Sequence, residues 1–321
     1  MGFFESARGA DEGYSNQDAS LRAYRASLAR RAKNKRTGHG DVARELNVSN
    51  LVLHPLSHRM LAAVGNRSRA GEPNVAVRGE TSARVCANSG LGHCVALGCP
   101  SLLLNPDIDL GATLQAKWAA LRARLDPRGA EDSDGRSGSV RPLRLAFQMP
   151  ARWSDELARL FVSAGHQFPD FVVILQMPHD ADAVLRLRRM GLPIADTQVK
   201  LFTSVRPWLH ELRGCDLQIG GRIHGTLAAV AASTPAVVVA TDMRIDEMAQ
   251  RMVIPRVRAH QLAAGNASLA RFVREHADFD GRLFDRNRAG IARTYARSLS
   301  ALGVPVSPRV LRIANIANIN E

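Results

Sequence analysis

The chain has 321 residues, of which 45% are hydrophobic and 23% are charged. This composition excludes a wholly disordered chain, and the length predicts about two domains at ~150 residues each. No apolar run reaches the ~18 residues that a membrane span needs, and the N-terminus carries acids where a secretory signal would carry basic residues. We therefore expect a cytoplasmic protein.

The cysteines are Cys86, Cys94, Cys99 and Cys215, and none of them forms a Cys-x-x-Cys motif. In a chain of this size and compartment we interpret them as thiols rather than as a disulfide framework. Metal-ligand spacing is absent from the sequence as well. We therefore predict no metal site.

The formal net charge is +13, which raises the expectation of an anionic partner such as a phosphorylated small molecule, a membrane surface or nucleic acid. Arginine supplies most of the excess, which a compositional bias would also explain. Residues 21–36 gather basic side chains without an acid, and could contact an anionic membrane or form a solvated helix. Because no nucleic-acid-binding motif accompanies this segment, nucleic acid is an alternative that we do not expect.

Residues 1–45 are polar and basic, and we expect a partly disordered segment there. Short apolar runs then alternate with amphipathic stretches. The predicted strands are residues 51–54, 74–78, 95–97, 143–147, 171–176, 198–202, 216–219, 236–240 and 253–254. The predicted helices are residues 81–88, 114–125, 154–164, 180–190, 205–213, 224–232 and 245–251, followed by two C-terminal helices.

Residues 126–140 are rich in Gly, Ser and Asp, which indicates a linker. It would separate a short first domain, residues 46–125, from a second domain, residues 141–280, with C-terminal helices over residues 281–321. Strands that alternate with helices of about ten residues predict an α/β fold with parallel, doubly wound sheets. Ligands of such sheets bind beyond the carboxyl ends of the strands, so the chemistry is expected just after a strand.

The sequence Gly-Gly-Arg-Ile-His-Gly, residues 220–225, follows a predicted strand and opens a predicted helix. Glycine lets a ligand approach the backbone, and a helix start attracts anions. Arg222 adds a bidentate donor, and His224 can exchange a proton near neutral pH. We predict Arg222 and His224 as catalytic residues. The predicted substrate-binding residues here are Arg222, Gly221 and Gly225, together with Asp242 and Arg244 after the next strand.

A second group of residues lies in the first half of the chain. Arg78 follows a predicted strand, where it could reach a cleft between the domains as a substrate-binding residue or pair with Glu80. Cys99 lies in a tight Gly-Cys-Pro-Ser turn after the next strand. No His–Asp partner for a nucleophilic thiol can be identified near it in the sequence, and we interpret Cys99 as structural.

Three blocks of sequence resemble the polysaccharide pyruvyl transferases in their order and spacing: VRGETSA from residue 77, GCPSLLLNPD from residue 98, and DLQIGGRIHGTLAAVAASTPAVVVATDMR from residue 216. The resemblance covers roughly residues 74–256. It implies a glycosyltransferase-B-like fold of two Rossmann-like halves and a reaction without a metal. Family members usually have a longer first domain, so we expect the first half here to be shortened.

The resemblance also implies the reaction, which is transfer of a pyruvyl group from phosphoenolpyruvate onto a saccharide, or lipid-linked saccharide, as a ketal. The product would belong to a cell-surface polysaccharide or exopolysaccharide, with no cofactor beyond the donor substrate. His224 would provide acid–base catalysis, and Arg222 with the helix start at Gly225 would hold the phosphate. Arg152 resembles a substrate-binding arginine often found after the first strand of the second domain.

Two alternatives remain open at this point. The first is a nucleotide-sugar glycosyltransferase of the same fold, for which Asp242 or Glu247 would be the acidic ribose-binding residue. The second is a degenerate, non-catalytic member that binds an anion or a partner surface.

Overall fold

The structure, a computed structural model, describes residues 50–68, 71–126, 141–151, 153–177, 180–262 and 268–316. The described residues up to Gly98, with Thr294–Val306, form one compact unit, and the remainder from Cys99 onward forms a second. The units thus divide at Gly98, so residues 99–125, expected in the first domain, pack with the second. The predicted N-terminal segment 1–45, including the basic residues 21–36, and positions 127–140 of the predicted linker lie outside the described residues.

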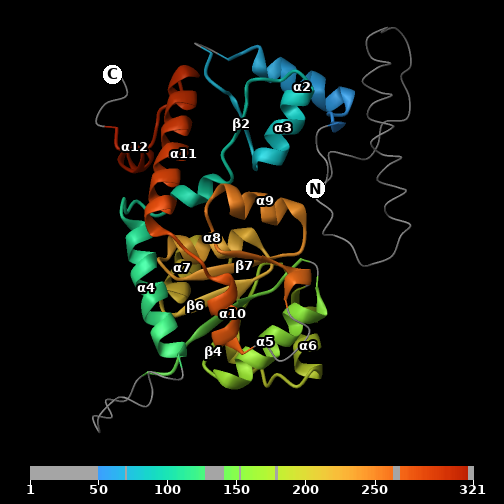
Figure 1. The fold of residues 1–321 in the computed structure, drawn as a ribbon, viewed down its shortest axis with the longest axis vertical. Coiled ribbons are helices and arrows are strands. Elements are labelled where there is room, and N and C mark those ends of the chain that lie inside the picture. Colours follow the sequence, from blue (N-terminus) through green and yellow to red (C-terminus); the bar gives the residue numbers. More distant parts are fainter. Residues whose placement is uncertain are drawn as a thin grey trace. The chain divides into compact units, whose positions relative to one another are not determined.

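The second unit is built on a six-stranded sheet in which every neighbouring pair of strands is parallel (Figure 1). The strand order is β5-β4-β3-β6-β7-β8, so the chain winds outward in two directions from the central pair β3 and β6. In that pair Gln148 lies opposite Gly220. The strands are β3 (Leu145–Gln148), β4 (Phe171–Leu175), β5 (Val199–Leu201), β6 (Leu217–Gly220), β7 (Ala236–Ala240) and β8 (Arg256–Arg258).

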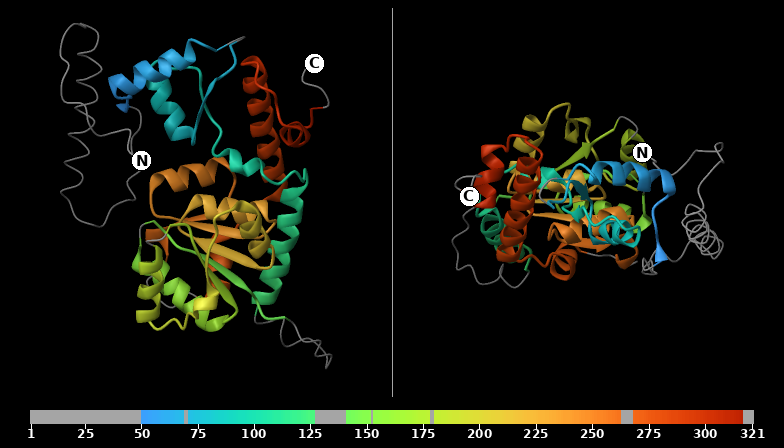
Figure 2. Two further views of the ribbon diagram at one scale, coloured as in Figure 1. Left: turned by 180° about the vertical axis from the view of Figure 1, so that it is seen from behind. Right: turned by 90° about the horizontal axis from the view of Figure 1, so that it is seen from above.

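Helices cover both faces of this sheet, as the two further views show (Figure 2). One group consists of α5 (Asp155–Gln167), α6 (Ala181–Arg189) and α10 (Leu269–His276), which also contacts α4 (Leu110–Leu125). The other group consists of α7 (Val205–Arg213), α8 (Ile223–Ala231) and α9 (Met243–Arg251). The remaining elements are α11 (Gly281–Ala301), α12 (Pro308–Ala314) and the 3-10 turns η2 (Pro100–Leu103), η5 (Asp196–Gln198) and η6 (Ala259–Gln261).

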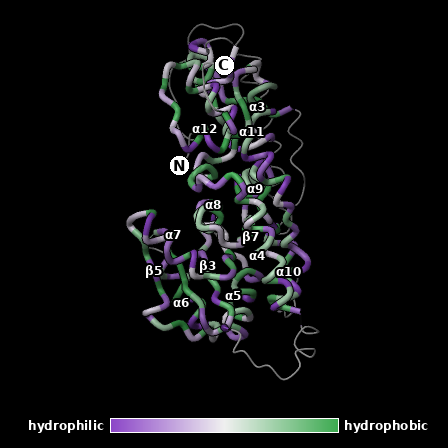
Figure 3. The backbone as a smooth tube through the Cα atoms, turned by 90° about the vertical axis from the view of Figure 1, so that its left-hand side faces the viewer, coloured by the Kyte–Doolittle hydropathy of each residue, from purple (hydrophilic) through white to green (hydrophobic). Residues whose placement is uncertain are grey.

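The core of the second unit lies between the sheet and these helices. All five residues of β4 and all five of β7 are buried, as expected for parallel strands covered on both faces. In Figure 3 the tube is largely green, or hydrophobic, along the central strands and alternates with purple along the surrounding helices. Ser154 begins α5 as predicted, because its side chain accepts a hydrogen bond from the N–H of Leu157 at 3.2 Å.

The first unit contains a two-stranded parallel sheet. The chain passes from β1 (Val75–Val77) through α3 (Glu80–Asn88) to β2 (Cys94–Ala96), with α2 (Pro55–Gly65) before it. This is a single β-α-β arrangement, much smaller than the second sheet. The prediction of an α/β protein with parallel sheets is confirmed, with six strands in the second unit and two in the first.

Some predicted elements are wrong, and the structure shows why. Residues 51–54 form no strand, because the N–H of Leu53 donates to Ser89 Oγ at 2.9 Å and the carbonyl of Leu51 accepts from Asn88 at 3.1 Å, which are side-chain partners. Val253 has a φ of 56°, so the chain turns there and β8 begins only after Pro255. The helix α2 was not predicted, although Pro55 at its first position is a typical helix start.

None of the helices in the described parts of the chain combines the length and the apolar character that a membrane crossing requires.

Candidate active site

The carboxyl ends of β3 and β6 define the candidate site. These two central strands are adjacent and parallel, and the connections that leave them run in opposite directions along the sheet. Such a reversal of strand order opens a crevice in doubly wound sheets, and ligands bind there. Residues 149–151 follow β3, and residues 221–224 follow β6 and start α8. The structure therefore brings the predicted Gly-Gly-Arg-Ile-His-Gly sequence to the switch point of the sheet.

The glycines of that sequence serve close packing. A Cβ atom added to Gly225 would lie 2.5 Å from Cγ and Oε1 of Gln148, and one added to Gly221 would lie 2.4 Å from Cβ of Pro150. Gln148 is buried, and its Nε2 donates to the carbonyl of Ile174 at 2.9 Å. The space that the sequence suggested for a ligand at Gly221 and Gly225 is thus occupied by side chains of the last residue of β3 and of the turn after it. The glycines let α8 begin directly against that strand.

Arg222 forms a buried ion pair that the sequence did not reveal. Its Nη2 lies 2.6 Å from Asp180 Oδ1, and the two side chains are 12% and 2% exposed. Asp180 Oδ2 also accepts the N–H groups of Gln176 and Met177, at 2.9 and 3.0 Å. Since the carboxylate neutralises the guanidinium, Arg222 cannot supply a full positive charge to a phosphate while this pair is intact.

Two buried nitrogens beside this ion pair have no hydrogen-bond partner among the described residues. They are Arg222 Nε and Gln176 Nε2, and the Nη1 of Arg222 lies 3.4 Å from the Gln176 side-chain oxygen. Buried donors are normally satisfied, so unpaired ones often mark a place for an acceptor. Arg222, the N-cap residue of α8, makes no side-chain hydrogen bond to the first turn of the helix. By contrast, Asp242 caps α9 at the end of the adjacent strand β7.

His224 and Cys99 come together at the start of α8, although 99 and 224 lie far apart in the sequence. Cys99 precedes η2, and η2 packs against α8. The thiol lies beside the His224 side chain, which lowers its pKa, and Ser101 Oγ lies 2.9 Å from Sγ. Partial burial alone would raise the pKa of this thiol, but the hydrogen bonds and the imidazole charge outweigh burial and set it at about 7.

The sequence therefore did not reveal the partner of Cys99. The residues around Cys99 in the sequence include no histidine that pairs with it, because the fold supplies His224 from 125 positions further along the chain. The backbone N–H of Cys99 also donates to the Met252 thioether at 3.4 Å, at the end of α9. His224 is exposed and Cys99 is partly buried, so a ligand can reach the pair.

The other predicted residues fall into different surroundings. Asp242 accepts N–H groups of Arg244 and Ile245 as the cap of α9, and its Oδ2 lies 2.6 Å from Arg244 Nη2. The carboxylate of Asp242 and the guanidinium of Arg244 thus form an ion pair with each other. Arg78 is an exposed residue at the end of β1, in the first unit. Arg152 lies outside the described residues.

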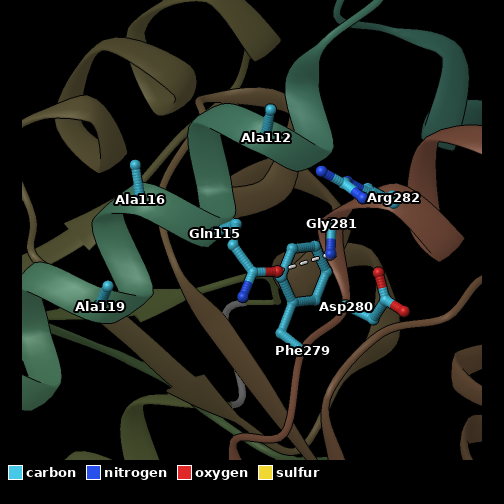
Figure 4. Close-up of a pocket in the computed structure, with 8 residues that line it drawn as sticks. All are labelled: Ala112, Gln115, Ala116, Ala119, Phe279, Asp280, Gly281 and Arg282. Atoms are coloured by element: carbon cyan, nitrogen blue, oxygen red, sulfur yellow. Dashed lines mark hydrogen bonds between the residues drawn. The ribbon is translucent and has the colours of Figure 1, made fainter.

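A hollow of about 570 Å³ lies elsewhere on the second unit, along α4 and the start of α11 (Figure 4). Its wall includes Ala112, Ala116 and Ala119, and the N–H of Gly281 donates across it to Gln115 Oε1 at 2.7 Å. None of the predicted site residues lines this hollow. Within the described residues, no three or more His, Cys, Asp or Glu side chains gather as metal ligands would.

The chain is similar to known proteins in sequence and, weakly, in structure. A sequence model of the family "Polysaccharide pyruvyl transferase" matches residues 48–243. No curated protein gives a significant match. The crystal structure of Anabaena Alr3699/HepE in complex with UDP and glucose is similar at 15% identity and a TM-score of 0.32, over 77% of this chain and 70% of that one. The structure of the glycotransferase of kitacinnamycin is similar at 13% identity and a TM-score of 0.28, over 78% and 67%. At these TM-scores neither likeness carries an argument.

Proposed function

The chain belongs to the polysaccharide pyruvyl transferase family, and on that premise we propose that it transfers the pyruvyl group of phosphoenolpyruvate to a saccharide as a ketal. The observation that carries this proposal is the extent of the match. Residues 48–243 include Cys99, Asp180, Arg222 and His224, which are the groups gathered at the switch point of the sheet. The acceptor would be a saccharide, or lipid-linked saccharide, from which a cell-surface polysaccharide or exopolysaccharide is made.

The donor carries a phosphate and a carboxylate, so its site must attract two anionic groups. The start of α8 contributes the partial positive charge and the N–H groups of a helix N-terminus. Arg222 lies at that start, with Nε as an unpaired donor among the described residues. Asp180 would fix the orientation of the guanidinium rather than let it move freely. This arrangement supports recognition by directed hydrogen bonds more than by net charge.

The reaction adds one proton to carbon and removes two protons from acceptor hydroxyls. The methylene carbon of the donor gains a proton and becomes the methyl group of the ketal, while the neighbouring carbon is attacked by one acceptor hydroxyl. Phosphate leaves as the second hydroxyl attacks the same carbon. One hydroxyl proton balances the proton placed on carbon, and the other leaves with the phosphate. We assign His224, exposed at the start of α8, to accept the proton of the attacking hydroxyl.

Donor binding is the first measurement, by calorimetry with phosphoenolpyruvate and with UDP-glucose as the control ligand. Replacing Arg222 alone would leave Asp180 as a buried carboxylate without its cation and would destabilise the folded protein. The variant to use is therefore the double replacement Arg222→Gln with Asp180→Asn, which removes both charges together. We expect binding of phosphoenolpyruvate by the wild type and at least a tenfold weaker affinity in the double variant. Preference for UDP-glucose would favour the nucleotide-sugar reaction instead.

Turnover is measured as phosphate release from phosphoenolpyruvate in the presence of a panel of saccharide acceptors, with mass spectrometry of the product. Replacing His224 by Gln should lower turnover by roughly 10²- to 10⁴-fold while donor binding persists, because general acid–base catalysis contributes about that factor. Absence of both donor binding and turnover in the wild type would overturn the proposal and leave a non-catalytic, anion-binding member of the family.

A further inference from the structure

The thiol of Cys99 differs from every other cysteine of the chain. Burial raises the pKa of Cys215 to about 12, and burial together with a hydrogen bond to Cys86 does the same for Cys94. Cys86 is buried. Cys99 alone combines a partly open position with a hydrogen bond to Ser101 and a neighbouring imidazole, that of His224. Such surroundings are typical of chemically active thiols.

The position of this thiol matches the needs of the reaction proposed above. The reaction needs an acid that gives a proton to the methylene carbon of the donor and a base that takes a proton from the attacking hydroxyl. The methylene carbon and the hydroxyl oxygen lie at different places on the reacting molecules. A group that transfers a proton must lie within hydrogen-bond reach of the reacting atom, so two groups can serve the two places in a single geometry. Cys99 and His224 are two neighbouring proton-carrying groups where η2 packs against α8, so together they serve both places.

We propose that Cys99 is the acid that protonates the methylene carbon of the donor, with His224 as the group that returns the proton to it. This inference rests on the proposed function and adds a second catalytic residue to it. The donor would lie with its phosphate toward the start of α8 and its methylene group toward the Cys99 sulfur. Arg222, on the same helix start, is held by Asp180.

The S–H bond of Cys99 breaks and a C–H bond forms at the methylene carbon, which leaves a thiolate next to the imidazole. The electron pair of the carbon–carbon double bond forms the new C–H bond, and the neighbouring carbon is attacked by the acceptor hydroxyl. His224 takes the hydroxyl proton and passes it to the thiolate, which restores the pair. Ser101 stabilises the thiolate in between by its hydrogen bond.

The state of the thiol can be tested without any turnover. Alkylation by iodoacetamide, followed peptide by peptide with mass spectrometry, should give Cys99 a rate that rises with a midpoint near pH 7. The buried thiols provide internal controls in the same sample and should react far more slowly. In the Ser101→Ala and His224→Gln variants the Cys99 midpoint should move to higher pH. An unchanged midpoint in both variants would overturn the pairing.

The catalytic role is tested with Cys99→Ala and with Cys94→Ala as the matched control. We expect Cys99→Ala to bind phosphoenolpyruvate within about threefold of the wild type and to lose roughly 10²- to 10⁴-fold in turnover. Cys94→Ala should retain the donor affinity and the turnover of the wild type. If the wild type turns over and Cys99→Ala does so equally well, the role of Cys99 is wrong while the proposed function stands. If the wild type neither binds the donor nor turns over, the proposed function itself fails.

The pH profile separates an acid from a merely structural residue. Because the thiol must carry its proton, wild-type kcat/KM should fall as the pH rises through about 7. In Ser101→Ala this alkaline limb should shift upward by the same amount as the alkylation midpoint, with the plateau at lower pH largely retained. If the alkaline limb of the kcat/KM profile does not shift with the alkylation midpoint, the assignment of Cys99 as the acid is wrong.

Discussion

Arg288 donates from Nε to the backbone carbonyl of Leu102 over 3.1 Å, although the two residues are 186 positions apart in the sequence. Its Nη1 and Nη2 donate to the carbonyls of Asp107 and Asn105. Burial lowers the pKa of this guanidinium to about 10, with Asp285 and Asp107 opposing the effect, so Arg288 stays charged at neutral pH. A buried cation of α11 thus holds the loop that begins with Cys99.

Replacing Arg288 by Met should therefore destabilise the protein and disturb the thiol. Three carbonyls would lose a charge-assisted partner, and we expect the free energy of unfolding to fall by on the order of 3 kcal/mol. Urea denaturation measures this loss, and the alkylation profile of Cys99 reports on the loop. The control is Arg286→Met, an exposed position on the same helix, where little change is expected. Equal stability of the two variants would contradict the anchoring role of Arg288.

The start of α8 depends on a glycine. A methyl group at Gly225 would lie 2.5 Å from the buried Gln148 side chain, and overpacking of this kind costs about 1–3 kcal/mol. At Gly290, in the middle of α11, a Cβ would meet nothing within 4 Å, so Ala there should be neutral or stabilising. Thermal unfolding of the two Gly→Ala variants compares these sites, and a Gly225→Ala protein as stable as Gly290→Ala would contradict the packing.

The ion pair between Arg222 and Asp180 should show strong coupling. Removing the carboxylate alone, as Asp180→Asn, leaves a buried guanidinium and should cost about 3–5 kcal/mol of unfolding free energy. The double variant with Arg222→Gln should lose less than the sum of the two single changes, and a double-mutant cycle in urea measures the difference. Glu275→Gln, at an exposed pair with Arg271, should leave stability unchanged. Strict additivity at 180 and 222 would show that the pair contributes nothing.

Asp242 should contribute to stability in a pH-dependent way. Burial alone would raise its pKa, but hydrogen bonds from Arg244 and Ile245 lower it below the ordinary 3.8. A folded pKa below the unfolded value gives stability that is complete above the unfolded pKa and is lost as the pH falls through the folded one. Asp242→Ala should cost about 0.5–2 kcal/mol at neutral pH through loss of the α9 cap, and this cost should shrink below pH 3.8. A cost that stays constant with pH would contradict the charged cap.

Cys215 should behave as a reporter of global unfolding. Burial raises the pKa of its thiol to about 12, with Arg144 opposing and Glu211 reinforcing the shift. Iodoacetamide should therefore modify Cys215 at neutral pH only when the second unit opens. Its labelling as a function of urea should follow the unfolding transition seen by circular dichroism. Labelling well before that transition would show that the end of α7 opens locally.

Much of the second unit could be predicted because its local signals agree. The helix over 205–213 and the strand over 236–240 were predicted with the bounds that the structure has, and the predicted helix over 154–164 starts at Ser154, which is the cap of α5. The misplaced strand at 253–254 failed because Val253 adopts a left-handed conformation, which no apolar pattern reveals. The loop at 51–54 was mistaken for a strand because side chains of a later helix satisfy its backbone.

The sequence by itself determined the alternation of strands and helices, the family resemblance, and the placement of Arg222 and His224 after a strand. Those features depend on neighbours within a few residues, where propensity, caps and spacing act. Only the tertiary structure decided the partners: Asp180 for Arg222, His224 for Cys99, and Leu102 for Arg288. Parallel strands must be joined by long crossovers, and these crossovers bring chain segments far apart in the sequence to one edge of the sheet. No local pattern can therefore name the groups that meet there.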